Sequence, residues 1–121
     1  MSAIPLASRR TVESRDFHLC VRCSHRGADW HHRRSRSVVD EHQHCPCNGI
    51  LLCRTCHNWV HAHPKDAKAQ GLIVGRHVEQ PTMVPVIVDD WWWVMHCSGE
   101  ATHVPTGRIA FNGVTPSVIE H

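Results

Sequence analysis

Short apolar runs separated by polar stretches are the main pattern along this chain. The three longest runs cover residues 50–53, 84–88 and 91–95. Runs of this length between turn-forming residues predict short β-strands, and shorter runs at 72–74 and 102–104 predict two more. None approaches the roughly 20 apolar residues that a membrane-spanning helix needs, so no membrane partner is expected.

Helical patterning is confined to the middle of the chain. Residues 54–63 predict a short helix, in which Trp59 and Val60 supply apolar surface and Pro64 ends the helix. A further turn or two of helix is expected at residues 65–70, with Gly71 as its C-cap.

The segments before this helix are more polar. Residues 28–34 predict a strand that contains Trp30, His31 and His32, and residues 33–49 form a long polar connection without a clear period. The dipeptide Asn48-Gly49 is a strong turn signal directly before the apolar run at 50–53.

The composition indicates a metal-binding protein. The chain has 121 residues, 41% hydrophobic and 20% charged, which suits one small globular domain with a modest core. Seven cysteines and thirteen histidines are unusually many for this length. These are the side chains that bind zinc and related metals in proteins.

The start of the chain bears on how the cysteines are interpreted. Residues 1–11 lack the apolar core of a secretory signal, so we expect a cytoplasmic protein in a reducing compartment. In such a compartment closely spaced cysteines act as metal ligands more readily than as disulfides. The odd number of cysteines agrees with that interpretation.

Charge is unevenly distributed along the chain. Residues 1–36 hold eight arginines against three acidic residues, a local balance of +5, whereas the whole chain carries +2. A basic segment leading into a metal site suggests a polyanionic partner, most simply nucleic acid. On charge alone, a solvated charged terminus is an equally good interpretation.

Two CxxC pairs are the strongest chemical signal. Cys20 with Cys23, and Cys53 with Cys56, are separated by 29 residues. A CxxC turn offers two sulfurs to one ion, and zinc prefers tetrahedral coordination by thiolates. We expect a structural Zn²⁺ here that supplies much of the folding free energy of so small a core. The alternative is that these are ordinary buried or free thiols.

The remaining cysteines give weaker signals. Cys45 and Cys47 could compete for this ion or bind another one, and an incidental loop pair is the preferred interpretation. Cys97 has no partner in the sequence and is expected to be a thiol of the core.

The histidines near the CxxC pairs follow a distinctive order. His31 and His32 lie between the two pairs, Asn48 precedes the second pair, and His57 and His61 follow at i, i+4 spacing on one helix face. Two imidazoles so placed can share one metal ion. Together with the CxxC pairs, this order resembles the HNH endonucleases, and with the residues that follow it is similar to small HNH proteins of actinobacterial phages.

The resemblance covers about half of the chain and implies a small α+β fold. Residues 17–64 would form a zinc-stabilised ββα-metal core, after a flexible basic arm at residues 1–16. Residues 65–121 would be a C-terminal extension with a short helix, strands and a tail that begins near residue 107.

The resemblance also implies roles for individual residues. His32 would be the general base, Asn48 would position it through hydrogen bonds to the backbone across the loop, and His57 would complete the catalytic set. His31, His57 and His61 would hold one catalytic divalent metal ion, Mg²⁺, Mn²⁺, Ni²⁺ or Zn²⁺. A neutral imidazole suits the base role near neutral pH because it can accept a proton from water.

The asparagine of the family and the arginines after His32 each have two possible interpretations. Asn58, on another helix face, is the competing candidate for the asparagine of the family. Arg33, Arg34 and Arg36 follow the base directly and would bind DNA phosphates on either side of the scissile one. In the alternative interpretation these arginines are merely a solvated strand end.

The resulting hypothesis is a metal-dependent HNH endonuclease that nicks or cuts DNA, with little sequence preference of its own. By resemblance it would be phage-encoded, act in the host cytoplasm and work beside the packaging terminase. The alternatives are a zinc-stabilised nucleic-acid-binding module without catalysis, and a protein-interaction module that uses the tryptophan run at 91–93.

Overall fold

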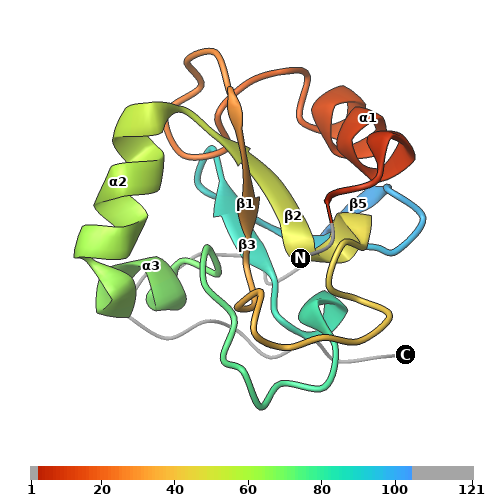
Figure 1. Ribbon diagram of the computed structural model, residues 1–121. Helices are drawn as coiled ribbons and strands as arrows, with labels where there is room; N and C mark the ends of the chain where they lie inside the picture. Colours follow the sequence, from red (N-terminus) through yellow and green to blue (C-terminus); the bar gives the residue numbers. More distant parts are fainter. Residues whose placement is uncertain (1–2, 105–121) are drawn as a thin grey trace.

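Two small antiparallel sheets and three α-helices make up residues 3–104, which the computed structural model describes (Figure 1). The expected small α+β class is confirmed at this level. No helix in this part of the chain is long and apolar enough to cross a membrane. The elements in chain order are α1 (Leu6–Arg15), β1 (Asp29–His32), the 3-10 helix η1 (Pro46–Asn48), β2 (Gly49–Leu52), α2 (Arg54–Ala62), α3 (Pro64–Ala69), the 3-10 helix η2 (Pro81–Met83), β3 (Val86–Val88), β4 (Trp91–Met95) and β5 (Ala101–His103).

The antiparallel pair β1–β2 fixes which side chains share a face. Trp30 lies opposite Leu51, and His31 lies opposite Ile50. Directly opposed residues of an antiparallel pair project to the same side, and consecutive residues project to opposite sides. One face of the pair therefore carries Trp30 and Leu51, and the other carries His31 and Ile50.

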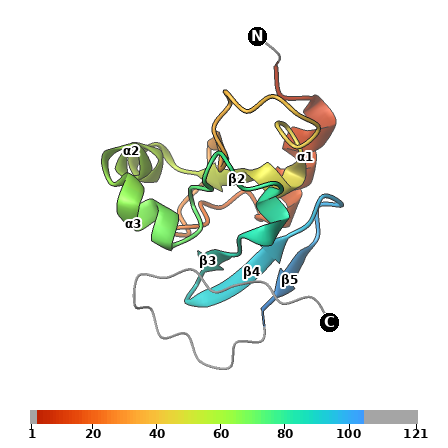
Figure 2. The ribbon, with the colours of Figure 1, turned by 90° about the horizontal axis from the view of Figure 1, so that it is seen from below.

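Helices cover both faces of this pair. Val12 of α1 packs with Trp30 and Leu51, whereas Ile50 joins the larger core that includes Val60 of α2. Figures 1 and 2 show α1 and α2 on opposite sides of β1–β2. Every residue of β2 is buried as a result, which explains why the strand is apolar throughout instead of alternating.

The second sheet has the order β3–β4–β5 and supplies Val86 and Met95 to the larger core (Figure 2). Alternation along β4 buries Trp92 and leaves Trp91 half exposed. The strands expected at 84–88 and 102–104 are present with shifted ends. The strand expected at 72–74 is absent, because Val74 makes only a single bridge to Arg34. The expected tail from residue 107 lies outside the described residues.

The expected flexible arm at residues 1–16 is wrong for most of its length, because α1 occupies residues 6–15. The helix is held to the core by its C-terminal end. Arg15 donates to the carbonyl oxygens of Pro46 and Gly49 and pairs with Asp16, whose carboxylate accepts the backbone N–H of Leu51. These buried polar contacts place one of the eight N-terminal arginines inside the fold.

Gly49 serves a different purpose from the expected turn. It is the first residue of β2 and has an extended backbone, with φ −108° and ψ 137°. The ring of Trp30 lies directly over it, so that a Cβ on residue 49 would come within 2.2 Å of the ring. The absence of a side chain is what allows Trp30 to pack between α1 and the strand pair.

We predict that Gly49→Ala destabilises the protein by about 1–3 kcal/mol, the usual cost of overpacking a close-packed site. Chemical denaturation followed by tryptophan fluorescence would measure this cost. Gly75→Ala is the matched control, because a Cβ there would meet nothing closer than 3.7 Å. Equal stability of the two variants would contradict the packing argument.

Candidate metal centres and active site

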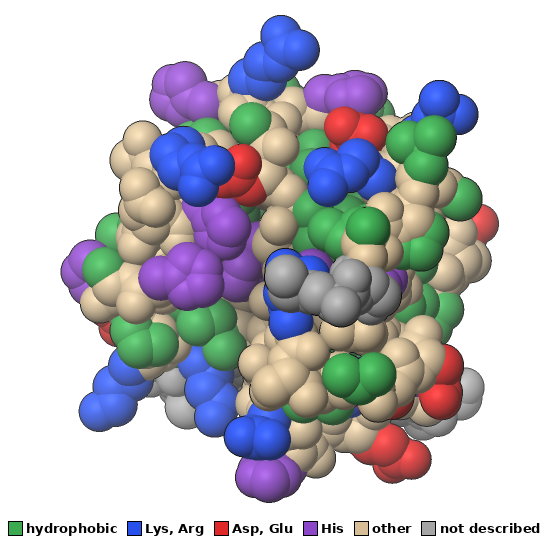
Figure 3. All heavy atoms as spheres, in the orientation of Figure 1, with side chains coloured by type: hydrophobic (Ala, Val, Ile, Leu, Met, Phe, Trp, Pro, Cys, Tyr) green, Lys and Arg blue, Asp and Glu red, His purple; other side chains and the backbone are tan. Residues whose placement is uncertain are grey.

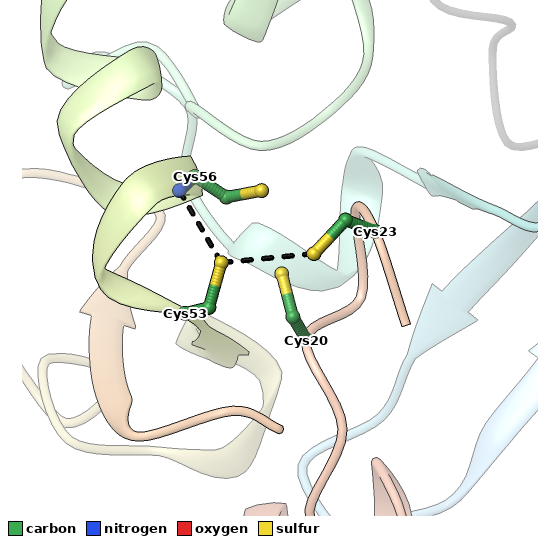
Figure 4. A group of neighbouring side chains, drawn as sticks. All are labelled: Cys20, Cys23, Cys53 and Cys56. Atoms are coloured by element: carbon green, nitrogen blue, oxygen red, sulfur yellow. Dashed lines mark hydrogen bonds between the residues drawn. The ribbon is translucent and has the colours of Figure 1, made fainter. Parts of the chain in front are cut away.

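The two CxxC pairs meet in space, as expected. Ligand atoms of Cys20, Cys23, Cys53 and Cys56 all lie within 4.8 Å of one another, and Figure 4 shows the four sulfurs pointing together. The Sγ atoms of Cys23 and Cys53 are 3.6 Å apart. A tetrahedral zinc site with Zn–S bonds of about 2.3 Å has S···S edges of about 3.8 Å. The cluster could therefore hold a structural metal such as zinc.

Local backbone structure explains how each pair is presented. Cys53 is the N-cap of α2, and its sulfur accepts the backbone N–H of Cys56 at 3.4 Å. This hydrogen bond lowers the pKa of Cys53 to about 7, which favours the thiolate form that binds metals. In the pair Cys20 and Cys23, the backbone N–H of Ser24 donates to the carbonyl oxygen of Cys20 and closes the turn that carries both sulfurs.

Arg22 is a neighbour of this cluster that the spacing of cysteines did not reveal. Its guanidinium donates to the sulfur of Cys56 at 3.4 Å and lies over the ring of Trp59, 3.7 Å from the ring centroid. Around a bound ion, a cation at this position would offset part of the negative charge of four thiolates. Trp59 thus packs beside the cysteine cluster, on the same helix α2 that carries Cys56.

The histidine cluster combines one strand residue with two helix residues. His31 of β1 and His57 and His61 of α2 have ligand nitrogens within 4.8 Å of one another. Their ring centroids are 4.9–5.8 Å apart. Figure 3 shows histidine side chains gathered on the face between α2 and β1. The three residues expected to share one ion are therefore brought together.

In His31 and in His57, one ring nitrogen makes a hydrogen bond to a neighbouring residue. The other ring nitrogen stays available to bind a metal ion. His31 Nε2 lies 2.8 Å from the carbonyl oxygen of Leu72, so it carries the proton and donates, which leaves Nδ1. His57 Nδ1 lies 3.0 Å from Asp29 Oδ2, which leaves Nε2. Carbonyl and carboxylate partners of this kind orient metal-binding imidazoles.

Asp29 and Leu72 were missed at the sequence level. Asp29 lies two residues before His31 on the same strand, so strand alternation alone places both on one face. Leu72 follows Gly71 and has no such signal in the sequence. Burial lowers the pKa of His31 to about 4, which keeps the ring neutral at physiological pH.

His32 projects from the opposite face of β1, as the strand period requires. Its Nε2 lies 3.2 Å from Nδ1 of His44, a residue left unassigned by the sequence. Burial, together with the nearby charges of Arg36 and His44, lowers the pKa of His32 to about 4. The ring is half-buried and neutral near pH 7.

Asn48 is buried and makes the hydrogen bonds across the loop that were expected of it. Its Oδ1 accepts the backbone N–H of Arg34 at 2.7 Å, and its Nδ2 donates to the carbonyl oxygens of Arg34 and Gln43. These bonds hold the chain just after His32 and just before His44. The competing Asn58 is exposed on α2.

Arg33 and Arg34 are not surface residues, and their expected role as phosphate ligands is wrong. Their exposed fractions are 1% and 2%. The Arg33 guanidinium donates to carbonyl oxygens, and burial lowers its pKa to about 9. Arg34 donates to carbonyl oxygens and pairs with Asp40 at 2.6 Å. Of the three arginines only Arg36 is exposed. The acceptors of Arg33 are Gly71, Cys47, Pro81 and Val84.

A third cluster corrects two other expectations. Cys97 is exposed and is not a thiol of the core. It lies with Cys45, Cys47 and His42, whose ligand atoms are all within 4.8 Å of one another. The pair Cys45 and Cys47 is therefore part of a larger group of donors.

No family model, curated protein or solved structure matches this chain.

We predict that Cys56→Ser removes one equivalent of bound zinc and abolishes cooperative unfolding. The reason is that a zinc ion bound by the four cysteines would supply much of the folding free energy. Elemental analysis and circular dichroism would measure both effects. Thr55→Ala, an exposed change between the two ligands, is the control and should keep metal and fold. A dichroism spectrum unchanged by strong chelator at neutral pH would contradict the four-cysteine site.

We also predict that Arg33→Met lowers the free energy of unfolding by about 2 kcal/mol or more, since several buried carbonyl groups lose their donor. Arg36→Met is the control in the same segment and should change stability by less than about 0.5 kcal/mol, as is usual for exposed positions. Urea denaturation of the two variants would decide. Comparable stability would mean that Arg33 is not a structural residue.

Proposed function

We propose that this protein is a metal-dependent endonuclease of the HNH type, which hydrolyses phosphodiester bonds of DNA. The observation that carries the proposal is the convergence of His31, His57 and His61, with His32 as the next residue of the same strand. The succession of β1, β2 and α2 around this cluster supports a ββα-metal fold for residues 17–64.

The donor set favours some metals over others. His31 through Nδ1, His57 through Nε2 and His61 would hold the ion, and imidazole ligands suit Zn²⁺ or Ni²⁺ better than Mg²⁺, which prefers oxygen. When bound, a divalent ion there would neutralise charge on the phosphate and on the leaving oxygen. The hydrogen bonds of His31 to Leu72 and of His57 to Asp29 would orient these rings toward the ion.

His32 is the proposed general base. Its ring is neutral near pH 7, so it can accept the proton of the attacking water. With Nε2 held against His44, the remaining Nδ1 is the atom that would take this proton. Asn48 supports this role by fixing the backbone at Arg34 and Gln43, on either side of the paired histidines.

Phosphate binding needs other residues than Arg33 and Arg34. Arg36 is exposed and close enough to lower the pKa of His32, so its guanidinium lies near the proposed base. Arg54 is exposed on α2 and reaches Asp29, the partner of His57. We propose that Arg36 and Arg54 contact phosphates beside the scissile one.

We also propose a biological setting for this activity. The resemblance of residues 17–64 to HNH proteins of actinobacterial phages supports action on DNA beside a packaging terminase, in the cytoplasm of the host. We propose that it cuts DNA with little sequence preference of its own.

A plasmid nicking assay with Mg²⁺, Mn²⁺, Ni²⁺ or Zn²⁺ tests this function. We predict that His32→Ala lowers the rate at least about 100-fold, the usual contribution of a general base, while fold and metal content persist. His63→Ala is the control, because His63 is exposed and its ring stacks on Trp59 outside the cluster.

Two results would contradict the proposal. Cutting by His32→Ala at the rate of the unmodified protein would show that another group is the base. DNA binding without cutting in any of the four metals would favour the alternative, a zinc-stabilised nucleic-acid-binding module.

A further inference from the structure

The third cluster joins two parts of the fold that are far apart in the sequence. His42, Cys45 and Cys47 belong to the long connection between β1 and β2, and Cys97 belongs to the turn between β4 and β5. None of these residues belongs to the four-cysteine cluster or the histidine cluster. We propose that this cluster is a second structural zinc site with a Cys3His ligand set. The proposal does not depend on nuclease activity.

The spacing of the donor atoms matches one shared ion. His42 Nδ1 lies 3.8 Å from the sulfur of Cys47 and also 3.8 Å from the sulfur of Cys97. A zinc ion with Zn–S of about 2.3 Å and Zn–N of about 2.0–2.1 Å has S···N edges of about 3.6 Å. A single Nδ1 lone pair cannot accept from two thiols at once, but it can bind one ion that both sulfurs also bind.

The ligands are held in place by the fold around them. The backbone N–H of His42 donates to Asp40 Oδ1 at 2.8 Å, and Asp40 is itself paired with the buried Arg34. Cys47 is fully buried in η1, which packs against β4, and its carbonyl accepts from Arg33. The other nitrogen of His42 faces the exposed Glu41 at 3.6 Å, which leaves Nδ1 for the site.

The position of the cluster suits an ion that would hold the connection between β1 and β2 in one conformation. Residues 35–45 contain no helix or strand, and none of them belongs to either apolar cluster. A connection of this length without a core requires some other constraint to adopt one conformation. One ion would tie it to the β4–β5 turn, and would also hold His44, which lies between two of the ligands and contacts His32.

A disulfide accounts for the cluster less well than zinc. A single disulfide would use two of the three sulfurs. It would not explain why the third thiol and the imidazole lie so close to them. Four donors of the Cys3His type are a common structural zinc set, with His nitrogen and thiolates in one tetrahedron.

Metal counting with a matched pair of variants tests the site. Purified full-length protein, Cys97→Ser and Ser98→Ala would be compared under reducing conditions by elemental analysis. We expect Cys97→Ser to contain one equivalent of zinc less than the unmodified protein, and Ser98→Ala to contain the same amount. Equal zinc in all three proteins would overturn the proposal.

Thiol protection gives a second readout that needs no variant. Cys97 is exposed, so a free thiol there would react readily with iodoacetamide. We expect it to resist alkylation in the zinc-loaded protein and to react after chelation, as followed by mass spectrometry. Alkylation at the same rate before and after chelation, or a disulfide from Cys97 to Cys45 or Cys47 in the purified protein, would overturn the proposal.

Discussion

The pair β1–β2 is buried on both faces, and the rest of the structure depends on this constraint. Strand β2 has only four residues, yet each is buried, because α1 covers one side and α2 the other. A two-stranded ribbon is marginal in water by itself, so these helices are what make it persist. The same constraint separates the two adjacent histidines: His31 faces α2, and His32 faces the side of Trp30.

Buried arginines organise the polar connection between the strands. Arg33 is surrounded by four carbonyl oxygens from three segments. Arg15 and Arg34 each combine carbonyl acceptors with one carboxylate. Arginine suits this purpose because its planar group offers five donors in fixed directions. Segments with few apolar side chains are in this way joined through hydrogen bonds from arginine to their backbone carbonyl groups. Part of the positive charge that clusters in the sequence therefore lies inside the fold, in these hydrogen bonds.

The sequence was informative where a pattern is local and failed where it depends on distant chain segments. CxxC spacing and i, i+4 histidines identify the cysteine cluster and most of the histidine cluster, because both reflect short-range geometry. Helix α1 was missed since its polar and apolar residues show almost no helical asymmetry. The burial of Arg33 and the meeting of Cys97 with His42 depend on how the two sheets pack, which no local pattern encodes.

Helix α2 carries candidate ligands of two different centres within nine residues, Cys56 at its start and His57 and His61 after it. Such a short helix moves as one rigid piece, so a shift that improves one set of ligands displaces the other. Occupancy of the two centres would then be thermodynamically linked, with each ion changing the affinity of the other by the same factor.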